Sequence, residues 1–136
     1  MRVLVDTDVL IDVALDRQPH ADEAVTLLKQ LEGRRADGFM AWHSASNFCY
    51  LVAPSSGKQD AREFLVDLTS FLEIAATTTD SLRIAGRLPL KDFEDAMQVA
   101  AALACGADLI ATRNVRDYAK APIEVVTPAV LVRRLA

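Results

Sequence analysis

The chain has 136 residues, 51% of them hydrophobic and 25% charged, with only five glycines and five prolines, which excludes disordered and fibrous proteins. The 15 basic and 19 acidic residues give a net charge of −4, so the chain is not a uniformly basic protein that binds nucleic acid without specificity, although a local basic patch would be enough for binding. This length predicts one domain over residues 1–136, which folds without a disulfide or structural metal.

Short apolar runs alternate with helical patterns along the chain. In chain order they predict a strand at 3–5, helices at 9–15 and 19–33, a strand at 38–42, helices at 44–52 and 59–68, a strand at 71–75, helices at 80–88 and 93–105, strands at 109–111 and 123–126, and a helix from 127 onward. Ser44 and Asp92 are predicted N-caps, and segment 54–57 and Gly106 are predicted to end helices. This alternation indicates an α/β fold, a three-layer sandwich with a central parallel sheet of about five strands flanked by helices.

The chain carries no sign of membrane insertion or secretion. No apolar stretch reaches 18 residues, and Asp6, Asp8 and Asp12 interrupt the apolar N-terminus, so neither a membrane span nor a signal peptide is expected. Cys49 and Cys105 lie in apolar helical patterns without a CxxC partner or a histidine at metal-ligand spacing. We interpret them as reduced core residues, which fits a cytoplasmic protein.

Polar side chains gather where the carboxyl ends of two strands should meet. They are Asp6 after the first strand, Asp92, Glu94 and Asp95 at the start of helix 93–105, and Asn114 and Asp117 after the fourth strand. Ligands of parallel sheets bind at this edge, where the strand order reverses. If the first and fourth strands are neighbours there, the carboxylates converge, and their repulsion requires protons or a cation. Oxygen ligands favour Mg²⁺ or Mn²⁺.

These acidic residues also have structural interpretations. Asp92 and Asp95 could form a capping arrangement that complements the helix dipole. Asp8 is interpreted as the cap of the helix that follows it, and Asp12 as part of a solvated helix face. Asp6 is different, because an aspartate that abuts a buried strand loses its hydration and needs a partner.

Three segments carry a resemblance to a known family. They are VLVDTDVLID at 3–12, DFEDAMQVAAA at 92–102 and TRNVRDY at 112–118. Their order and spacing resemble those of PIN-domain proteins, the fold of VapC-like toxin ribonucleases. With the helices between them they span nearly the whole chain, so the resemblance implies a single PIN-like domain over residues 1–136.

The resemblance implies a ribonuclease that depends on Mg²⁺ or Mn²⁺ and that could be the toxin of a toxin–antitoxin pair. The family's first aspartate corresponds to Asp6 and its helix-start aspartate to Asp95, with Asp92 as an additional metal ligand. The family's Thr-Arg-Asp segment corresponds to residues 112–114. We therefore expect Asp6, Asp95 and Asp92 to be the metal ligands.

Two amides stand where the family usually has acids. Asn47 occupies the place of a glutamate that usually follows the second strand, and Asn114 occupies the place of the last aspartate. Asp92 and Asp117 are candidates to supply the missing charge. The resemblance is closest to a subgroup with asparagine at both places, so we keep Asn47, Asn114 and Asp117 among the candidate catalytic residues.

The expected partners are RNA, an antitoxin protein and a second copy of the chain. Thr112, Arg113 and Arg116 are the candidate substrate-binding residues at the rim. Arg113 has an equally weighted alternative, as a structural partner that neutralises the acidic cluster.

Two other functions stay open at this point. The first is a PIN-fold module that binds RNA or protein without cutting, because Asn47 and Asn114 lower the charge of the site. The second is a phosphatase of the haloacid-dehalogenase type, in which Asp6 of the sequence DTDV would be the nucleophile. His20 and His43 are isolated, and no GxSxG, P-loop or GxGxxG motif is present.

Overall fold

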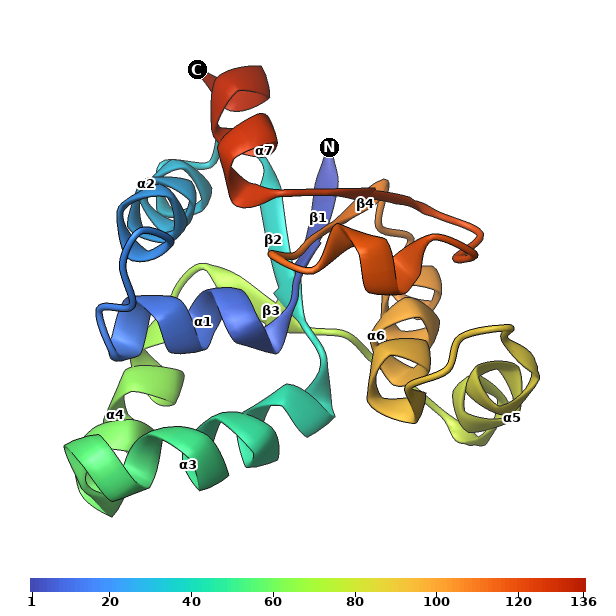
Figure 1. The fold of residues 1–136 in the computed structure, drawn as a ribbon, viewed down its shortest axis with the longest axis horizontal. Helices are drawn as coiled ribbons and strands as arrows, with labels where there is room; N and C mark the ends of the chain where they lie inside the picture. The colour runs from blue at the N-terminus through green and yellow to red at the C-terminus, as the bar shows by residue number, and fades with distance from the viewer.

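A computed structural model describes residues 1–136 and contains a five-stranded sheet with helices on both faces (Figure 1). The strand order is β3-β2-β1-β4-β5, and every neighbouring pair is parallel. The strands are β1 (Arg2–Val5), β2 (Asp37–Met40), β3 (Leu72–Ile74), β4 (Leu109–Ala111) and β5 (Glu124–Val126). The prediction of a central parallel sheet of about five strands is therefore confirmed.

The helices lie between successive strands, in the alternation that the sequence predicts. They are α1 (Thr7–Ala14), α2 (Ala21–Glu32), α3 (Trp42–Ser56), α4 (Lys58–Leu68), α5 (Thr79–Arg87), α6 (Phe93–Ala104), the 3₁₀ turn η1 (Val115–Tyr118) and α7 (Pro128–Leu135). None of them has both the length and the apolar character of a membrane-spanning segment.

Two cores lie on opposite faces of the sheet because successive side chains of a strand point to opposite sides. Val3 and Val5 of β1 enter the larger core, which α1, α2, α3, α4 and α7 cover. Leu4 enters the second core and packs with Val99 of α6. Figure 1 shows these helix groups on the two sides of the sheet, with α5 outside α6. This arrangement is the predicted three-layer sandwich.

The start of α1 differs from the prediction. The helix begins at Thr7, and Asp6 is its N-cap, with the Asp6 side chain accepting a hydrogen bond from the Thr7 backbone N–H. Asp8 therefore lies inside the first turn, and its interpretation as the cap was wrong. The reason is that β1 ends at Val5, so the chain turns into the helix two residues earlier than the apolar pattern suggests.

Helix α3 also differs at both ends. It begins at Trp42 instead of after Ser44, and Ser44 is a fully buried side chain within the helix, not its cap. The helix continues through Pro54 and ends at Ser56, because Gly57 takes a positive φ of 89°. A proline near the last turn removes only one helical hydrogen bond, so it does not break the helix there.

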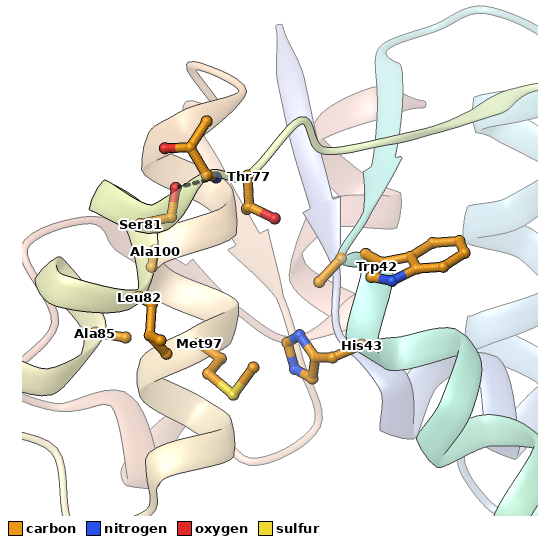
Figure 2. A pocket seen from close by; sticks show the side chains of 10 residues that line it. Trp42, His43, Thr77, Ser81, Leu82, Ala85, Met97 and Ala100 are labelled. Atoms are coloured by element: carbon orange, nitrogen blue, oxygen red, sulfur yellow. Dashed lines mark hydrogen bonds between the residues drawn. The ribbon is translucent and has the colours of Figure 1, made fainter.

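A small hollow of about 390 Å³ lies between the start of α3 and helices α5 and α6 (Figure 2). Leu82 and Ala85 of α5 and Met97 of α6 give it an apolar wall, and His43 of α3 closes the opposite side. His43 thereby connects this hollow to the acidic region described next.

Candidate active site

The site forms where β1 and β4 lie side by side at the reversal of the strand order. Val5 pairs with Ala111 in the parallel register, so Asp6 and Thr112 follow their strands at the same level. The Asp6 backbone N–H donates to the Ala111 carbonyl over 2.9 Å. The predicted neighbourhood of the first and fourth strands is therefore correct, and it brings distant segments together.

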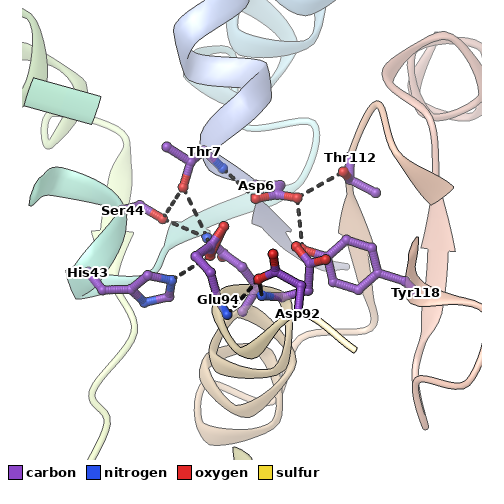
Figure 3. Close-up of polar contacts among 10 residues, drawn as sticks. Asp6, Thr7, His43, Ser44, Asp92, Glu94, Thr112 and Tyr118 are labelled. Carbon is purple, nitrogen blue, oxygen red and sulfur yellow. Dashed lines mark hydrogen bonds and ion pairs between the residues drawn. The ribbon is translucent and has the colours of Figure 1, made fainter. Parts of the chain in front are cut away.

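Asp6 lies at the centre of the site and is only 4% exposed. Its Oδ1 accepts from the Thr7 N–H over 2.7 Å. Its Oδ2 accepts from the Thr112 hydroxyl and from the Tyr118 hydroxyl, each over 2.8 Å (Figure 3). Burial raises the pKa of Asp6, the nearby Glu94 charge raises it further, and the hydrogen bonds oppose the shift. A buried carboxylate is thus held in place by three donors.

Tyr118 is a functional candidate that the sequence did not single out. It lies on η1 and is 2% exposed. Burial, then the Asp6 charge and the Asp6 hydrogen bond, raise the pKa of the Tyr118 hydroxyl, so it remains a protonated donor. Tyr118 ends the TRNVRDY segment, six residues after Thr112, so the sequence placed it near the site. Its hydrogen bond with Asp6 joins residues 112 positions apart in the chain, and the sequence did not reveal it.

Asp8 is the second acid at the sheet edge. Its Oδ2 accepts from the Asn114 side-chain amide over 3.0 Å and lies 3.2 Å from the Thr112 hydroxyl. Its Oδ1 is buried without a hydrogen-bond partner. Burial, followed by the Asp6 charge, raises the pKa of Asp8 to about 7. A carboxyl oxygen left unpaired beside a second carboxylate indicates a place for a proton or a cation.

Helix α6 presents its N-terminus to this edge. Asp92 is the N-cap, as predicted, and its Oδ1 accepts from the backbone N–H groups of Glu94 and Asp95 over 2.8 and 3.2 Å. Burial raises the pKa of Asp95 to about 7, with the charges of Asp92, Asp6 and Glu94 as further causes. The structural interpretation of Asp92 is therefore correct, while Asp95 is a half-buried acid close to Asp6 and Glu94.

Glu94 joins this group through a polar network that the sequence did not reveal. Its Oε2 lies 2.7 Å from His43 Nε2 and accepts from Gln98 Nε2 over 3.0 Å. Gln98 is fully buried and also lies within 3.0 Å of the hydroxyls of Thr7 and Ser44. Figure 3 shows this network beside Asp6. The spacing of Glu94 and Gln98, four residues apart on a helix that is apolar after its first turn, was the available signal.

The acidic hollow is an open cavity of about 700 Å³ at the carboxyl edge of the sheet. The polar residues on its wall are Asp6, Thr7, Asp8, Arg17, Asn47, Glu94, Asp95 and Asn114. The structure thus brings together Asp6, Asp95, Asn114 and Asn47, which are four of the predicted catalytic residues.

The other predicted residues open into a second hollow of about 950 Å³. It is lined by Asp92, Asp117, Arg116 and two lysines, Lys91 and Lys120. Asp95 is the one residue that lines both hollows. Asp92 and Asp117 therefore line a hollow that adjoins the acidic one at Asp95, and they do not line the same hollow as Asp6.

Arg113 and Thr112 face inward. The Arg113 guanidinium forms two hydrogen bonds with the Asp12 carboxylate, of 2.8 and 3.0 Å, and these raise the pKa of Arg113. Asp12 is 1% exposed, so its interpretation as a solvated helix residue was wrong. Thr112 is fully buried and donates to Asp6. Of the three predicted substrate-binding residues, Arg116 alone is an exposed side chain on a hollow.

The donor set of the acidic hollow fits a hard divalent cation. Carboxyl and amide oxygens line it, and the Asp8 Oδ1 lacks a partner. Oxygen donors of this kind suit Mg²⁺ or Mn²⁺. No three acidic, histidine or cysteine side chains already converge as a complete ligand set. A bound ion would therefore keep several waters, as Mg²⁺ commonly does.

Comparisons with known proteins find relatives that share this fold. A family model described as PIN domain matches residues 2–116. No curated protein matches the chain. Among solved structures, the chain is similar to VapBC2 from Rickettsia felis bound to a DNA fragment from its promoter, with a TM-score of 0.72 and 18% identity over 93% of this chain and 98% of that chain.

Two further structures share the fold. A toxin–antitoxin complex from Klebsiella pneumoniae has a TM-score of 0.69 and 25% identity over 93% of this chain and 97% of that chain. VapC20 from Mycobacterium tuberculosis, a toxin that cleaves the sarcin–ricin loop, has a TM-score of 0.62 and 16% identity over 79% of this chain and 86% of that chain.

Proposed function

Because the chain belongs to the PIN-domain family, we propose that it is a divalent-metal-dependent ribonuclease and the toxin of a toxin–antitoxin pair. Membership of this family leaves the haloacid-dehalogenase-type phosphatase without support. The hydrogen bonds on both oxygens of Asp6 also argue against a nucleophilic role for this carboxylate.

One observation carries the proposal. The carboxyl groups of Asp6, Asp8, Glu94 and Asp95 line one open hollow at the strand-order reversal, and one buried Asp8 oxygen has no partner. Burial, followed by the charges of neighbouring carboxylates, raises the pKa values of Asp8 and Asp95 to about 7, so keeping these groups charged there costs free energy. A divalent cation would relieve that penalty.

Asp6 and Asp95 are the proposed metal ligands, with Asp8 beside them. Asp92 is committed to capping α6 and opens into the second hollow, so it is the weaker of the candidate ligands. When bound, the ion would neutralise charge on a phosphate and lower the pKa of an attacking water. Tyr118 and Thr112 hold the Asp6 carboxylate for this role through their hydrogen bonds.

The second hollow is the proposed path of the RNA backbone. It adjoins the acidic hollow at Asp95 and carries three basic side chains, Lys91, Arg116 and Lys120. Contacts between such side chains and phosphates would make RNA binding depend on salt. Arg113 is paired with Asp12, so the structural alternative is favoured for it.

An antitoxin protein is the proposed partner, because the similar structures include the VapBC2 complex and a toxin–antitoxin complex. RNA is the proposed substrate, in line with the family and with VapC20, which cleaves the sarcin–ricin loop. A cytoplasmic location and a homodimer remain predictions. The predicted location rests on the two cysteines, Cys49 and Cys105, which are not paired with each other.

The deciding experiment is an RNA cleavage assay across a broad panel of single-stranded and structured RNAs. Wild type should cleave with Mg²⁺ or Mn²⁺, lose activity in EDTA and regain it when the metal returns. Asp6→Ala should be inactive while keeping its circular dichroism spectrum. Binding of RNA by wild type without metal-dependent cleavage of any RNA would instead favour the non-cutting PIN module.

A further inference from the structure

We propose that Glu94 is an additional metal ligand of the acidic hollow and supplies the charge on the wall where Asn47 is neutral. This inference rests on the proposed metal-dependent function. Glu94 belongs to the DFEDAMQVAAA segment at 92–102, but the expected metal ligands do not include it. The support for this role comes from four contacts and one shared cavity.

Glu94 lies in the lining of the acidic hollow. Glu94 and Asn47 both line the acidic hollow, together with Asp6 and Asp95. Asn47 lies on α3 and brings no charge, so the charged groups of this wall come from α6. Glu94 is one residue before Asp95, yet it takes a different direction, toward the buried face of α3 where His43 and Ser44 lie.

The Glu94 carboxylate is held through one of its two oxygens. His43 Nε2 and Gln98 Nε2 both contact the same oxygen of Glu94, Oε2, over 2.7 and 3.0 Å. The other oxygen, Oε1, takes part in no hydrogen bond with the protein. Partners on one oxygen fix the side-chain rotamer and leave the second oxygen free, which is how ligating carboxylates are commonly supported.

In a simpler interpretation, Glu94 only complements the dipole of α6. A first-turn acid needs no partner on another helix for that role. Here Gln98 is buried completely, contacts three oxygens with two hydrogens, and leaves its own Oε1 unpaired. Burying Gln98 with an unpaired oxygen costs free energy. The position of Gln98 is therefore better explained by a role in orienting Glu94 and Thr7 at the site.

The test compares Glu94→Gln with wild type in a Mn²⁺ titration by calorimetry, together with the melting-temperature increase that Mn²⁺ causes. Glutamine keeps the size of the side chain and an oxygen for His43 and Gln98, but removes the charge. We expect Mn²⁺ to bind at least about tenfold more weakly, since even residues that only support a ligand give losses of 10–100-fold. Glu23→Gln is the matched control, because Glu23 is a first-turn acid of α2, remote from the hollow.

A second arm restores the charge from α3, at position 47 of the same hollow. Asn47→Glu in the Glu94→Gln background should recover much of the Mn²⁺ affinity, which a purely structural role of Glu94 does not predict. If Glu94→Gln fails to fold, Glu94→Asp serves instead, since it keeps the charge but withdraws the carboxylate, and it should also bind Mn²⁺ more weakly.

The outcomes separate the two proposals. Wild-type Mn²⁺ affinity in Glu94→Gln or in Glu94→Asp, with binding lost in Asp6→Asn, would overturn the role of Glu94 and leave the metal-dependent nuclease standing. A wild-type protein that binds no Mn²⁺ and cleaves no RNA would overturn the proposed function and this inference with it.

Discussion

Arg113 and Asp12 form a two-pronged ion pair that ties the loop after β4 to the last turns of α1. Arg113 Nε and Nη2 donate to the two oxygens of Asp12 over 2.8 and 3.0 Å. The Asp12 side chain is 2% exposed and that of Arg113 is 27% exposed. This pair anchors the loop that carries Asn114 and holds the Arg113 guanidinium against α1.

The first prediction follows from the burial of Asp12. Arg113→Met should lower the free energy of unfolding by about 3 kcal/mol, because it leaves a buried carboxylate without its partner. The double variant Asp12→Leu, Arg113→Met should recover most of that loss, since no charge then remains buried. Urea denaturation of the two single variants and the double variant measures the coupling. Reduced RNA affinity of Arg113→Met at unchanged stability would instead assign Arg113 to the substrate.

The second prediction concerns the hydrogen bond from Tyr118 to Asp6. Tyr118→Phe removes a donor that opposes the raised pKa of Asp6, so this pKa should rise further. Metal ligands must be deprotonated, so the midpoint pH for Mn²⁺ binding should move upward, with affinity restored at higher pH. Tyr50→Phe is the control, because Tyr50 also lines the acidic hollow but is 82% exposed. An unchanged midpoint in Tyr118→Phe would contradict this role.

The layers of the fold could be predicted because their signals are local. Apolar runs mark the strands, and Asp92 and Gly106 stand at the ends of α6 as the sequence indicates. The end of α3 could not be predicted from Pro54 alone. Phe48 of α3 stacks on Phe64 of α4 with ring centroids 5.1 Å apart. This contact packs the two helices together, and the sequence around Pro54 does not reveal it.

The site was predictable in part for the same reason. Asp6, Asp95 and Asn114 follow strands or begin a helix, so topology alone brings them to one edge. Asp12 looked like a surface residue because its partner is 101 residues away in the chain. Glu94 was placed at this edge, but its role was not predicted because its partner His43, 51 residues away, looked isolated. Pairings over such separations depend on the register of packed helices, which a single sequence does not reveal.

The third prediction uses the contact between Asn114 and Asp8. The Asn114 amide donates to Asp8 Oδ2 over 3.0 Å, and Asn114→Asp replaces this donor by a like charge. The metal-free protein should therefore melt at a lower temperature, while Mn²⁺ should bind more tightly and stabilise it more. Asn114→Ala removes the same hydrogen bond without adding charge. It should therefore lower the melting temperature of the metal-free protein without tightening the binding of Mn²⁺.

Cleavage by Asn114→Asp then distinguishes two roles for the loop. Cleavage activity at or above that of wild type would mean that position 114 is a metal-ligand position, at which asparagine binds the ion more weakly than aspartate does. Lower activity together with tighter Mn²⁺ binding would mean that the added carboxylate crowds the site. Mn²⁺ affinity that falls in Asn114→Asp would contradict the placement of position 114 at the metal.

The fourth prediction concerns pH and begins with the metal-free protein. Asp8 and Asp95 have pKa values raised to about 7 from the usual 3.8. Between about pH 4 and pH 7 the folded protein therefore holds protons that the unfolded chain has released. These two groups make the free energy of unfolding fall as pH rises through this window, and their contribution becomes constant above pH 7.

Divalent metal should reverse that trend, because it binds the deprotonated carboxylates and releases their protons. The melting-temperature increase caused by Mn²⁺ should thus grow from pH 6 to pH 8, and it corresponds to about 2.7 kcal/mol at a free metal concentration 100 times Kd. Asp95→Asn should melt at a higher temperature than wild type at pH 8 without metal, and should lose most of the Mn²⁺ response. Asp60→Asn, at an exposed position in the first turn of α4, should leave both measurements unchanged. A full Mn²⁺ response in Asp95→Asn would remove Asp95 from the ligand set, because a carboxylate that holds the ion cannot be replaced by a neutral amide without weakening that link.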